Sequence, residues 1–377
     1  MDFVEILHFK LRAKSQYPKP NSETFINVSV FSRRHPIWSR KRIGSEFTVS
    51  TAARRASRNH GLIECGGLLF CYSLQNVSEQ GSLVEDYAVN LFVVYKPPIA
   101  SKSPAKFFYV DGSLSNWTLS PLTIDNDAAG VGATLREFYK HDQRQFAFAY
   151  NDDSPSGSVD SYRGHSKGVV LFDEETGFWI IHSVPNFPSI GSYSYPATGM
   201  KFGQTFLCLT LSTQSLGDVG EHLRYVQATP FFSNLPESFS VRFPVLVNIV
   251  KKQSLSKSET VFTRVRQFTT VGGQSLKSFA KHKKFNKDLW FDFVAPELRI
   301  NMAVESWLNG GADDLDSVYD VTSVALPGVT FNSSRDHSKW AVADSNGPNI
   351  VCIGDMNRQK SQLRRGGGAY YPFYGHL

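Results

Sequence analysis

The sequence His165-Ser166-Lys167-Gly168-Val169-Val170-Leu171-Phe172 leads from a polar start directly into an apolar run. A polar turn at residues 173–177 follows, then a second apolar run at residues 178–181 and an asparagine, Asn186. Two short apolar runs separated by a turn are typical of a pair of antiparallel strands. The stretch therefore predicts a strand, a turn and a returning strand, with the histidine and the lysine at the start of the unit and Asn186 at its end.

The same plan occurs a second time near the C-terminus. His337-Ser338-Lys339 is again followed by an apolar run, a turn, a second apolar run and an asparagine, Asn357. Asn186 lies 19 positions after Lys167, and Asn357 lies 18 positions after Lys339. A single His-x-Lys sequence is usually solvated and carries no function, but two copies with matched spacing indicate an internal duplication. The apolar runs of the second unit are residues 340–343 and 350–353.

The residue types in the two units suit a substitution at phosphorus. Residues two apart in a strand project from the same face, so the histidine and the lysine of each unit point together. One neutral imidazole can attack phosphorus while a protonated imidazole donates its proton to the leaving oxygen. Ammonium and amide groups can hold the non-bridging oxygens without a metal ion or another cofactor. The candidate residues are His165, Lys167, His337 and Lys339 as catalytic groups, and Asn186 and Asn357 as substrate-binding amides.

The amino-acid composition excludes several classes of protein. The 377 residues are 41% hydrophobic and 20% charged, which is typical of a folded protein, and the formal net charge is +6. This charge suits a polyanionic partner, although solubility alone explains it equally well. The longest apolar stretches, such as residues 88–95 and 243–250, are shorter than the roughly 18 residues of a membrane helix. The four cysteines contain no Cys-x-x-Cys pair, so neither zinc nor a disulfide scaffold is indicated.

The composition and the hydrophobic periodicity of the chain change along its length. Residues 1–80 are rich in Arg, Ser and Lys with little periodicity, and we expect an N-terminal extension outside the fold, disordered or removed. Residues 81–200 and 201–377 are predicted to form two halves, each with one His-x-Lys unit. Within the first half, residues 130–139 predict a helix, and residues 90–95 and 145–150 predict strands.

Longer motifs carry a family resemblance. They are Arg163-Gly164-His165-Ser166-Lys167-Gly168, the segment Phe178 to Pro188, Asp336-His337-Ser338-Lys339-Trp340, Gly354-Asp355-Met356-Asn357-Arg358, Phe92 to Pro97, Gly203-Gln204-Thr205, Ser278-Phe279-Ala280-Lys281 and Arg365 to Gly368. Together they resemble the deoxyribonuclease II family of the phospholipase D superfamily, over about residues 86–368.

The resemblance implies an α+β (α/β-like) fold of two phospholipase D-like halves. Each half would be a mixed β-sheet flanked by helices, related to the other by a pseudo-twofold axis with a central cleft. It also implies an acid endonuclease that cuts DNA without divalent metal through a covalent phosphohistidine and leaves 3′-phosphate ends. The family usually has cysteines near Met200 and Ala341, opposite Cys208 and Cys352, so we expect the corresponding disulfides to be absent here.

The sequence leaves two other functions open. A catalytically inactive secreted nucleic-acid-binding or host-interaction protein would keep the same fold, and a lipid phosphodiesterase would share the chemistry. The basic stretch Lys277–Lys287 fits either a phosphate backbone or a solvated face, and no base-reading motif is present, so DNA binding is expected to be sequence-independent.

The resemblance implies a lysosomal or secreted enzyme. Four Asn-x-Ser/Thr sequons, at Asn27, Asn76, Asn116 and Asn332, agree with a secretory route, but residues 1–20 contain no apolar signal segment. The sequence does not predict the oligomeric state.

Overall fold

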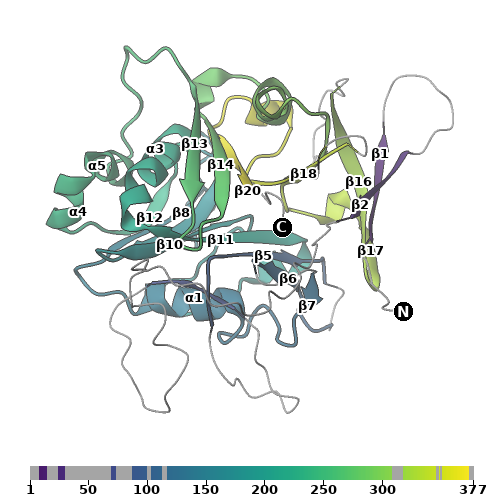
Figure 1. Ribbon diagram of the computed structural model, residues 1–377, viewed down its shortest axis with the longest axis horizontal. Coiled ribbons are helices and arrows are strands. Elements are labelled where there is room, and N and C mark those ends of the chain that lie inside the picture. Colours follow the sequence, from purple (N-terminus) through teal and green to yellow (C-terminus); the bar gives the residue numbers. More distant parts are fainter. Residues whose placement is uncertain are drawn as a thin grey trace, which may run out of the picture.

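The computed structural model describes residues 69–73, 87–99, 103–112, 117–307, 317–344, 348 and 350–372, together with the backbone of residues 8–14 and 24–29. The fold is α+β, with two large sheets and a few short helices (Figure 1). The strands are β1 His8–Lys14, β2 Thr24–Ser29, β3 Cys71–Ser73, β4 Tyr87–Val89, β5 Leu91–Lys96, β6 Phe108–Asp111, β7 Thr118–Leu119, β8 Phe146–Asn151, β9 Lys167–Phe172, β10 Thr176–His182, β11 Gln204–Ser212, β12 Pro230–Asn234, β13 Thr263–Thr269, β14 Ser275–Lys281, β15 Met302–Glu305, β16 Val318–Leu326, β17 Val329–Asn332, β18 Trp340–Ala343, β19 Val351–Gly354 and β20 Gly367–Pro372. The helices are α1 Gly130–Tyr139, α2 Ala197–Lys201, α3 Leu216–Val226, α4 Glu237–Arg242, α5 Pro244–Val250 and α6 Ala295–Leu298, with a π-helical turn η3 at Trp290–Val294.

Each sheet contains one of the two repeat units. In the described part of the chain, the first sheet has the order β12-β8-β9-β10-β11-β5-β6-β7, and the second has the order β13-β14-β20-β19-β18-β15-β16-β1-β2 with β17 paired to β16. The predicted strand-turn-strand units are the hairpins β9-β10 and β18-β19, and both are antiparallel. The strands predicted at residues 90–95 and 145–150 are β5 and β8, and the predicted helix 130–139 is α1, so these predictions are confirmed.

Successive side chains of the strands point to opposite faces of the sheet, and both faces are buried. This explains why the strand sequences are almost continuously apolar. In β8, Phe146, Phe148 and Tyr150 pack into a core between the two sheets, whereas Ala147 and Ala149 pack into a second core on the opposite face. Strand β18 alternates in the same way, with Trp340 and Val342 in the shared core. Helix α1 covers the outer face of the first sheet, and α3 lies on its other face, against the second sheet (Figure 1). Both faces of the central strands are therefore buried, which selects apolar residues at every position.

Backbone hydrogen bonds join the two sheets reciprocally at the starts of the repeat units. The amide of His165 donates to the carbonyl of Gly366 at 2.9 Å, and the amide of His337 donates to the carbonyl of Gly203 at 2.9 Å. Gly366 directly precedes β20 of the second sheet, and Gly203 directly precedes β11 of the first sheet. Each candidate histidine is thus fixed to the opposite sheet by its own main chain.

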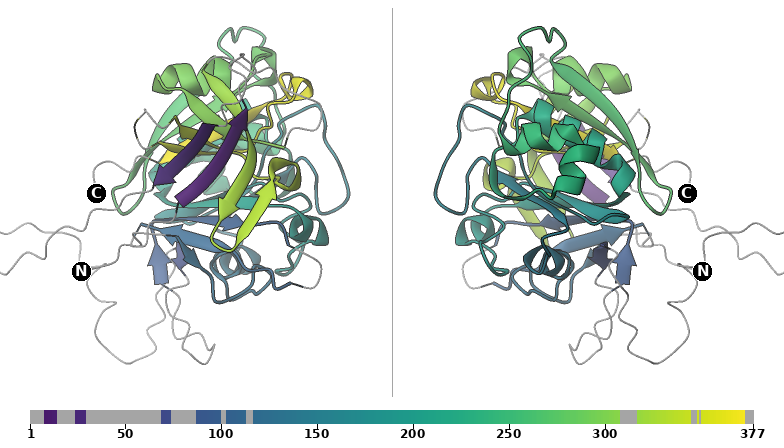
Figure 2. Two further views of the ribbon diagram at one scale, coloured as in Figure 1. Left: turned by 90° about the vertical axis from the view of Figure 1, so that its right-hand side faces the viewer. Right: turned by 90° about the vertical axis from the view of Figure 1, so that its left-hand side faces the viewer.

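Three described strands come from the N-terminal 80 residues: β1 and β2 belong to the second sheet, and β3 pairs with β4 in a separate two-stranded sheet. Strand β1 pairs with β16 and also with β2 at the edge of the second sheet, seen in purple in Figure 2. Cys71 of β3 forms a disulfide with Cys208 of β11, a pairing that the sequence analysis did not predict. Cys352 is a free, buried thiol. The domain boundaries at residues 80 and 200 stay a prediction.

Two further expectations concern membranes and glycans. Among the described residues, no helix combines the length and apolarity that crossing a bilayer requires. Asn332 is exposed at the end of β17, whereas the sequons at residues 76 and 116 lie outside the described residues.

We expect the substitution Gly164→Ala to weaken the junction between the sheets. A Cβ atom at Gly164 would lie 2.0 Å from the carbonyl oxygen of Val226, so one of the two backbones must move. The free energy of unfolding should fall by about 1–3 kcal/mol, as in other overpacked sites, in urea denaturation at constant pH.

The control for this substitution is Gly217→Ala in α3. There the new Cβ would approach only the ring of Phe243, at 3.5 Å, which is an ordinary contact. Equal losses of stability in the two variants would contradict the role given to Gly164.

Candidate active site

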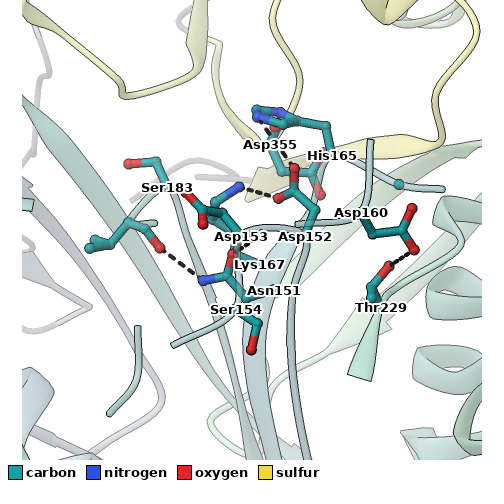
Figure 3. A network of polar contacts seen from close by, with 12 residues as sticks. Asn151, Asp152, Asp153, Ser154, Asp160, His165, Lys167, Ser183, Thr229 and Asp355 are labelled. Carbon is teal, nitrogen blue, oxygen red and sulfur yellow. Dashed lines mark hydrogen bonds and ion pairs between the residues drawn. The ribbon is translucent and has the colours of Figure 1, made fainter. Parts of the chain in front are cut away.

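His165 and Lys167 meet a carboxylate that the sequence analysis missed, Asp152. Asn151 at the end of β8 is paired with Lys167 at the start of β9, so the next residue, Asp152, lies beside that lysine. Lys167 donates a short hydrogen bond to Asp152, and His165 Nε2 lies 4.0 Å from Asp152 Oδ2 (Figure 3). His165, Lys167 and Asp152 therefore form a cluster where β8 ends and β9 begins.

A second cation, Arg365, completes the surroundings of Asp152. Its Nη2 lies 3.0 Å from Asp152 Oδ2 and also donates to the carbonyls of Asp160 and Gly164. Burial alone would raise the pKa of Asp152, but the charges of Lys167, His165 and Arg365 hold this pKa well below its usual range. Asp152 thus stays ionised in acid, where most carboxylates become protonated.

The imidazole of His165 is oriented by the second sheet. Its Nδ1 lies 2.7 Å from the carbonyl oxygen of Asp355, which follows β19. A carbonyl can only accept, so a neutral His165 carries its proton on Nδ1 and leaves the lone pair of Nε2 free. Burial lowers the pKa of His165 well below its usual value, Lys167 lowers it further, and Asp152 opposes both effects.

His337 has different surroundings, made of aromatic rings. The ring of Phe202 stacks on His337 with centroids 3.9 Å apart, and the indole of Trp307 lies 4.4 Å from it. Burial lowers the pKa of His337 to about 3, and Lys339 and Lys167 add to this effect. The two histidines therefore differ: a carboxylate adjoins one, and two aromatic rings adjoin the other.

The turn before His337 is fixed by a hydrogen bond from the first sheet. Tyr95 of β5 donates to Asp336, whose other oxygen accepts the Ser338 amide at 2.9 Å. Lys339 donates to the main-chain carbonyl of His337, at 2.5 Å. Burial lowers the pKa of Lys339 to about 7, and the charge of Lys167 contributes to this shift.

Two further carboxyl groups lie in the same region. Burial raises the pKa of Asp355 to about 8, although Lys167 and Lys339 pull it down, and Asp355 Oδ1 accepts the Gly368 amide at 2.6 Å. Glu305 at the end of β15 is fully buried, and burial together with Asp336 raises its pKa well above the usual range. Both groups favour the neutral acid, so cations dominate the site at low pH.

The two candidate asparagines are placed less directly. Asn186 donates from Nδ2 to Asp153 Oδ1 at 2.8 Å and to the carbonyl of Ser154 at 3.2 Å, so its amide nitrogen is engaged by the loop after β8. Asn357 is buried, and its Oδ1 has no hydrogen-bond partner among the described residues. Their role as substrate-binding amides stays a prediction.

Two buried lysines from motifs quoted in the sequence analysis support the histidine segments. Lys96 Nζ donates to the carbonyls of Met200 and Phe202, at 3.1 and 2.7 Å, just before Gly203. Lys281 Nζ donates to the carbonyl of Leu363, at 2.8 Å, just before Gly366. Burial lowers the pKa of Lys96 to about 7 and that of Lys281 to about 8. The ammonium groups of these two lysines therefore bind main-chain carbonyls of the loops before β11 and β20 instead of pointing into the site.

Lys281 also changes the interpretation of the basic stretch Lys277–Lys287. Both Lys281 and His282 are buried, whereas Lys284 and Lys287 are exposed. The stretch is therefore part of β14 and the turn after it, and only some of its cations face solvent. Within the described residues, no three His, Cys, Asp or Glu side chains gather into a group able to bind a metal ion.

Comparison with known proteins identifies the family of this chain. The family model "Deoxyribonuclease II" matches residues 64–370. The chain belongs to the deoxyribonuclease II family. It is 49% identical over 293 residues to "Cell-death-related nuclease 7" of Caenorhabditis elegans, covering 75% of this chain and 80% of the relative. It is 37% identical over 302 residues to "Deoxyribonuclease-2-alpha" of Rattus norvegicus, covering 74% and 85%. The match begins at residue 64, earlier than the sequence motifs indicate, and includes Cys71 of the disulfide.

We expect Asp152→Asn to destabilise the fold strongly at neutral pH. The amide cannot neutralise Lys167 and Arg365, and loss of one partner from a buried ion pair costs about 3–5 kcal/mol. Because the pKa of Asp152 is depressed in the folded state, the wild-type advantage is complete above about pH 3.9, the ordinary Asp value. It is lost as the pH falls further. Urea denaturation at pH 7 and pH 3 measures both effects.

Asp218→Asn is the matched control, because it removes the carboxylate of a partly exposed ion pair with Arg266 at 2.8 Å. Its cost should be about 0–1 kcal/mol. A loss for Asp152→Asn that is as small as this, or that does not shrink in acid, would contradict the charge assignment.

Proposed function

We propose that this protein is an endonuclease that hydrolyses DNA phosphodiester bonds without divalent metal. The observation that carries the proposal is the reciprocal pairing of the segments that begin the two His-x-Lys units. The electrostatics agree with one shared site: the charge of Lys339 lowers the pKa of His165, and the charge of Lys167 lowers the pKa of His337. The family match and the nucleases among the relatives support the same activity.

In the mechanism we propose, His165 attacks and His337 transfers protons. The free lone pair on His165 Nε2 forms a bond to phosphorus while the bond from phosphorus to the 5′-oxygen breaks, and protonated His337 gives its proton to that oxygen. Water then attacks phosphorus, gives a proton to His337 and releases His165. The products are a 5′-hydroxyl and a 3′-phosphate end. Lys167 and Lys339 stabilise the non-bridging oxygens, and Asp152 stabilises the positive charge on the His165 ring.

The pseudo-twofold relation between two phospholipase D-like halves belongs to this proposal. Three correspondences support it: the hairpins β9-β10 and β18-β19, the paired histidine segments, and the buried lysines Lys96 and Lys281 that hold equivalent loops. The axis would pass between the histidines, in a central cleft. The surroundings of the two rings break this symmetry, which allows the two histidines to take different roles.

Acid conditions favour the charge state that binds a phosphodiester. Lys339 becomes charged below about pH 7 and Asp355 becomes neutral below about pH 8, so the net charge of the site rises as the pH falls. A bound phosphate anion would also raise the pKa of His337 from about 3 toward the pH of an acidic compartment. We therefore infer a lysosomal or secreted setting, in agreement with the sequons. Oligomeric state plays no part in this mechanism.

The rival function is sequence-independent nucleic-acid binding without turnover. A plasmid nicking assay at pH 5 in EDTA separates the two. We expect nicking by the wild-type protein, and a loss of at least about 10³-fold in His165→Ala and in His337→Ala, because each removes a reacting group. Both variants should keep the wild-type melting temperature. Binding without nicking by the wild type would favour the rival, and near-full activity in either variant would remove that histidine from the mechanism.

The pH profile tests the charge argument separately. We expect kcat/KM for DNA to rise as the pH falls from 8.5 to 5, since Asp355 and Lys339 titrate in this interval. Asp355→Asn keeps an acceptor for the Gly368 amide but fixes the side chain as neutral, so the part of the rise near pH 8 should disappear. An unchanged profile in this variant would exclude Asp355 as its source.

A further inference from the structure

A cleft of about 590 Å³ is lined in part by residues that are close in the chain to His337 and to its stacking partner Phe202. Arg335, two residues before His337, forms part of its lining. Met200 and Lys201 line it as well, and the next residue, Phe202, stacks on the His337 ring at 3.9 Å. The cleft and the imidazole are therefore joined by two short stretches of chain.

The walls of the cleft are held by hydrogen bonds on both sides. On one side, Lys96 donates to the carbonyls of Met200 and Phe202. On the other side, the Ile124 amide donates to the carbonyl of Ala105 at 2.9 Å. Such a site is formed before its ligand arrives, and its volume lies within the about 300–1,000 Å³ of ordinary small-molecule sites.

The chemistry of the lining combines an apolar wall with a cationic rim. Ile99, Pro104 and Met200 supply apolar surface, and Lys201 and Arg335 supply the cations. Within the described part of the chain, neither of these cations forms an ion pair, and both are exposed. The lining also contains a carboxylate, Asp125, which is exposed. An anionic ligand with a flat apolar part matches this combination.

We propose that the cleft is a nucleotide subsite of the active site. The base of the nucleotide next to the scissile bond would pack on the apolar wall, and its outer phosphate would bind Lys201 and Arg335. This proposal rests on the proposed nuclease function and adds to it a place where the strand is held beyond the reacting phosphate. An apolar wall that contacts the face of a base does not read its hydrogen-bonding edge, so the subsite keeps cleavage sequence-independent.

The test compares DNA with a diester that has no flanking nucleotide, bis(4-nitrophenyl) phosphate. Ala197 lines the cleft and is exposed, so Ala197→Trp fills the subsite without changing the core. We expect kcat/KM for a single-stranded oligonucleotide to fall about tenfold, because one base loses its apolar contacts, with the small diester unaffected. Val241→Trp adds the same bulk on α4, where Val241 is exposed, and should change neither substrate.

The charges are tested by binding in the His165→Ala background, where the strand stays intact. Arg335→Gln and Lys201→Gln should each reduce the slope of log Kd against log salt by about 0.7, the value for one phosphate contact to a single strand. Lys140→Gln, at the exposed end of α1, removes the same charge elsewhere and should leave the slope unchanged.

The possible results distinguish a failure of the proposed nuclease function from a failure of the proposed subsite. If the wild-type protein cleaves neither substrate, the proposed function is wrong, and the salt slopes still decide whether the cleft binds phosphate. If the wild type cleaves DNA but the cleft variants equal their controls, the subsite is overturned and the function stands. Equal losses on both substrates would also overturn it, because a subsite beyond the reacting phosphate cannot affect the small diester. A lower melting temperature in Ala197→Trp would leave the decision to the two exposed charge variants.

Discussion

The reciprocal pairing of four short segments is the constraint on which the rest of the structure depends. The chain before each candidate histidine bonds to the chain before a strand of the opposite sheet, through Gly366 and Gly203. At the first of these pairs the end of α3 also comes close: a Cβ atom at Gly164 or at Gly366 would lie 2.0 or 2.3 Å from the Val226 carbonyl oxygen. Glycine at these positions allows the C-terminus of α3 to reach the junction. The position of each histidine therefore follows from main chain, not from a flexible side chain.

Burial at this junction determines the electrostatics of the site. Removing Lys339 and Asp355 from water favours their neutral forms, which moves their pKa values to about 7 and about 8. Asp152 is equally buried, yet two direct cationic partners keep it ionised. Similar burial thus favours the neutral form of Asp355 but leaves Asp152 ionised. The difference arises because Lys167 and Arg365 contact the Asp152 carboxylate directly. This arrangement makes the candidate site more cationic as the pH falls.

Much of the fold was predictable because the strands are buried on both faces. Continuous apolar runs such as residues 146–150 and 168–172 mark such strands, and the repeat of His-x-Lys followed by a hairpin shows that there are two units. The edge strands were not predictable, because β1 and β2 lie in a stretch with little periodicity. The disulfide partner of Cys208 was also missed, since a separation of 137 residues leaves no local signal.

The sequence by itself determined which candidate groups the protein carries: imidazole and ammonium groups in two matched units, located at or directly before the starts of β9 and β18. Only the tertiary structure decided what surrounds them. Asp152, Phe202 and Trp307 have no fixed spacing from the histidines, and they reach the site because neighbouring strands end there. The contacts that distinguish His165 from His337 join residues that are distant in the chain, so no local pattern could reveal them.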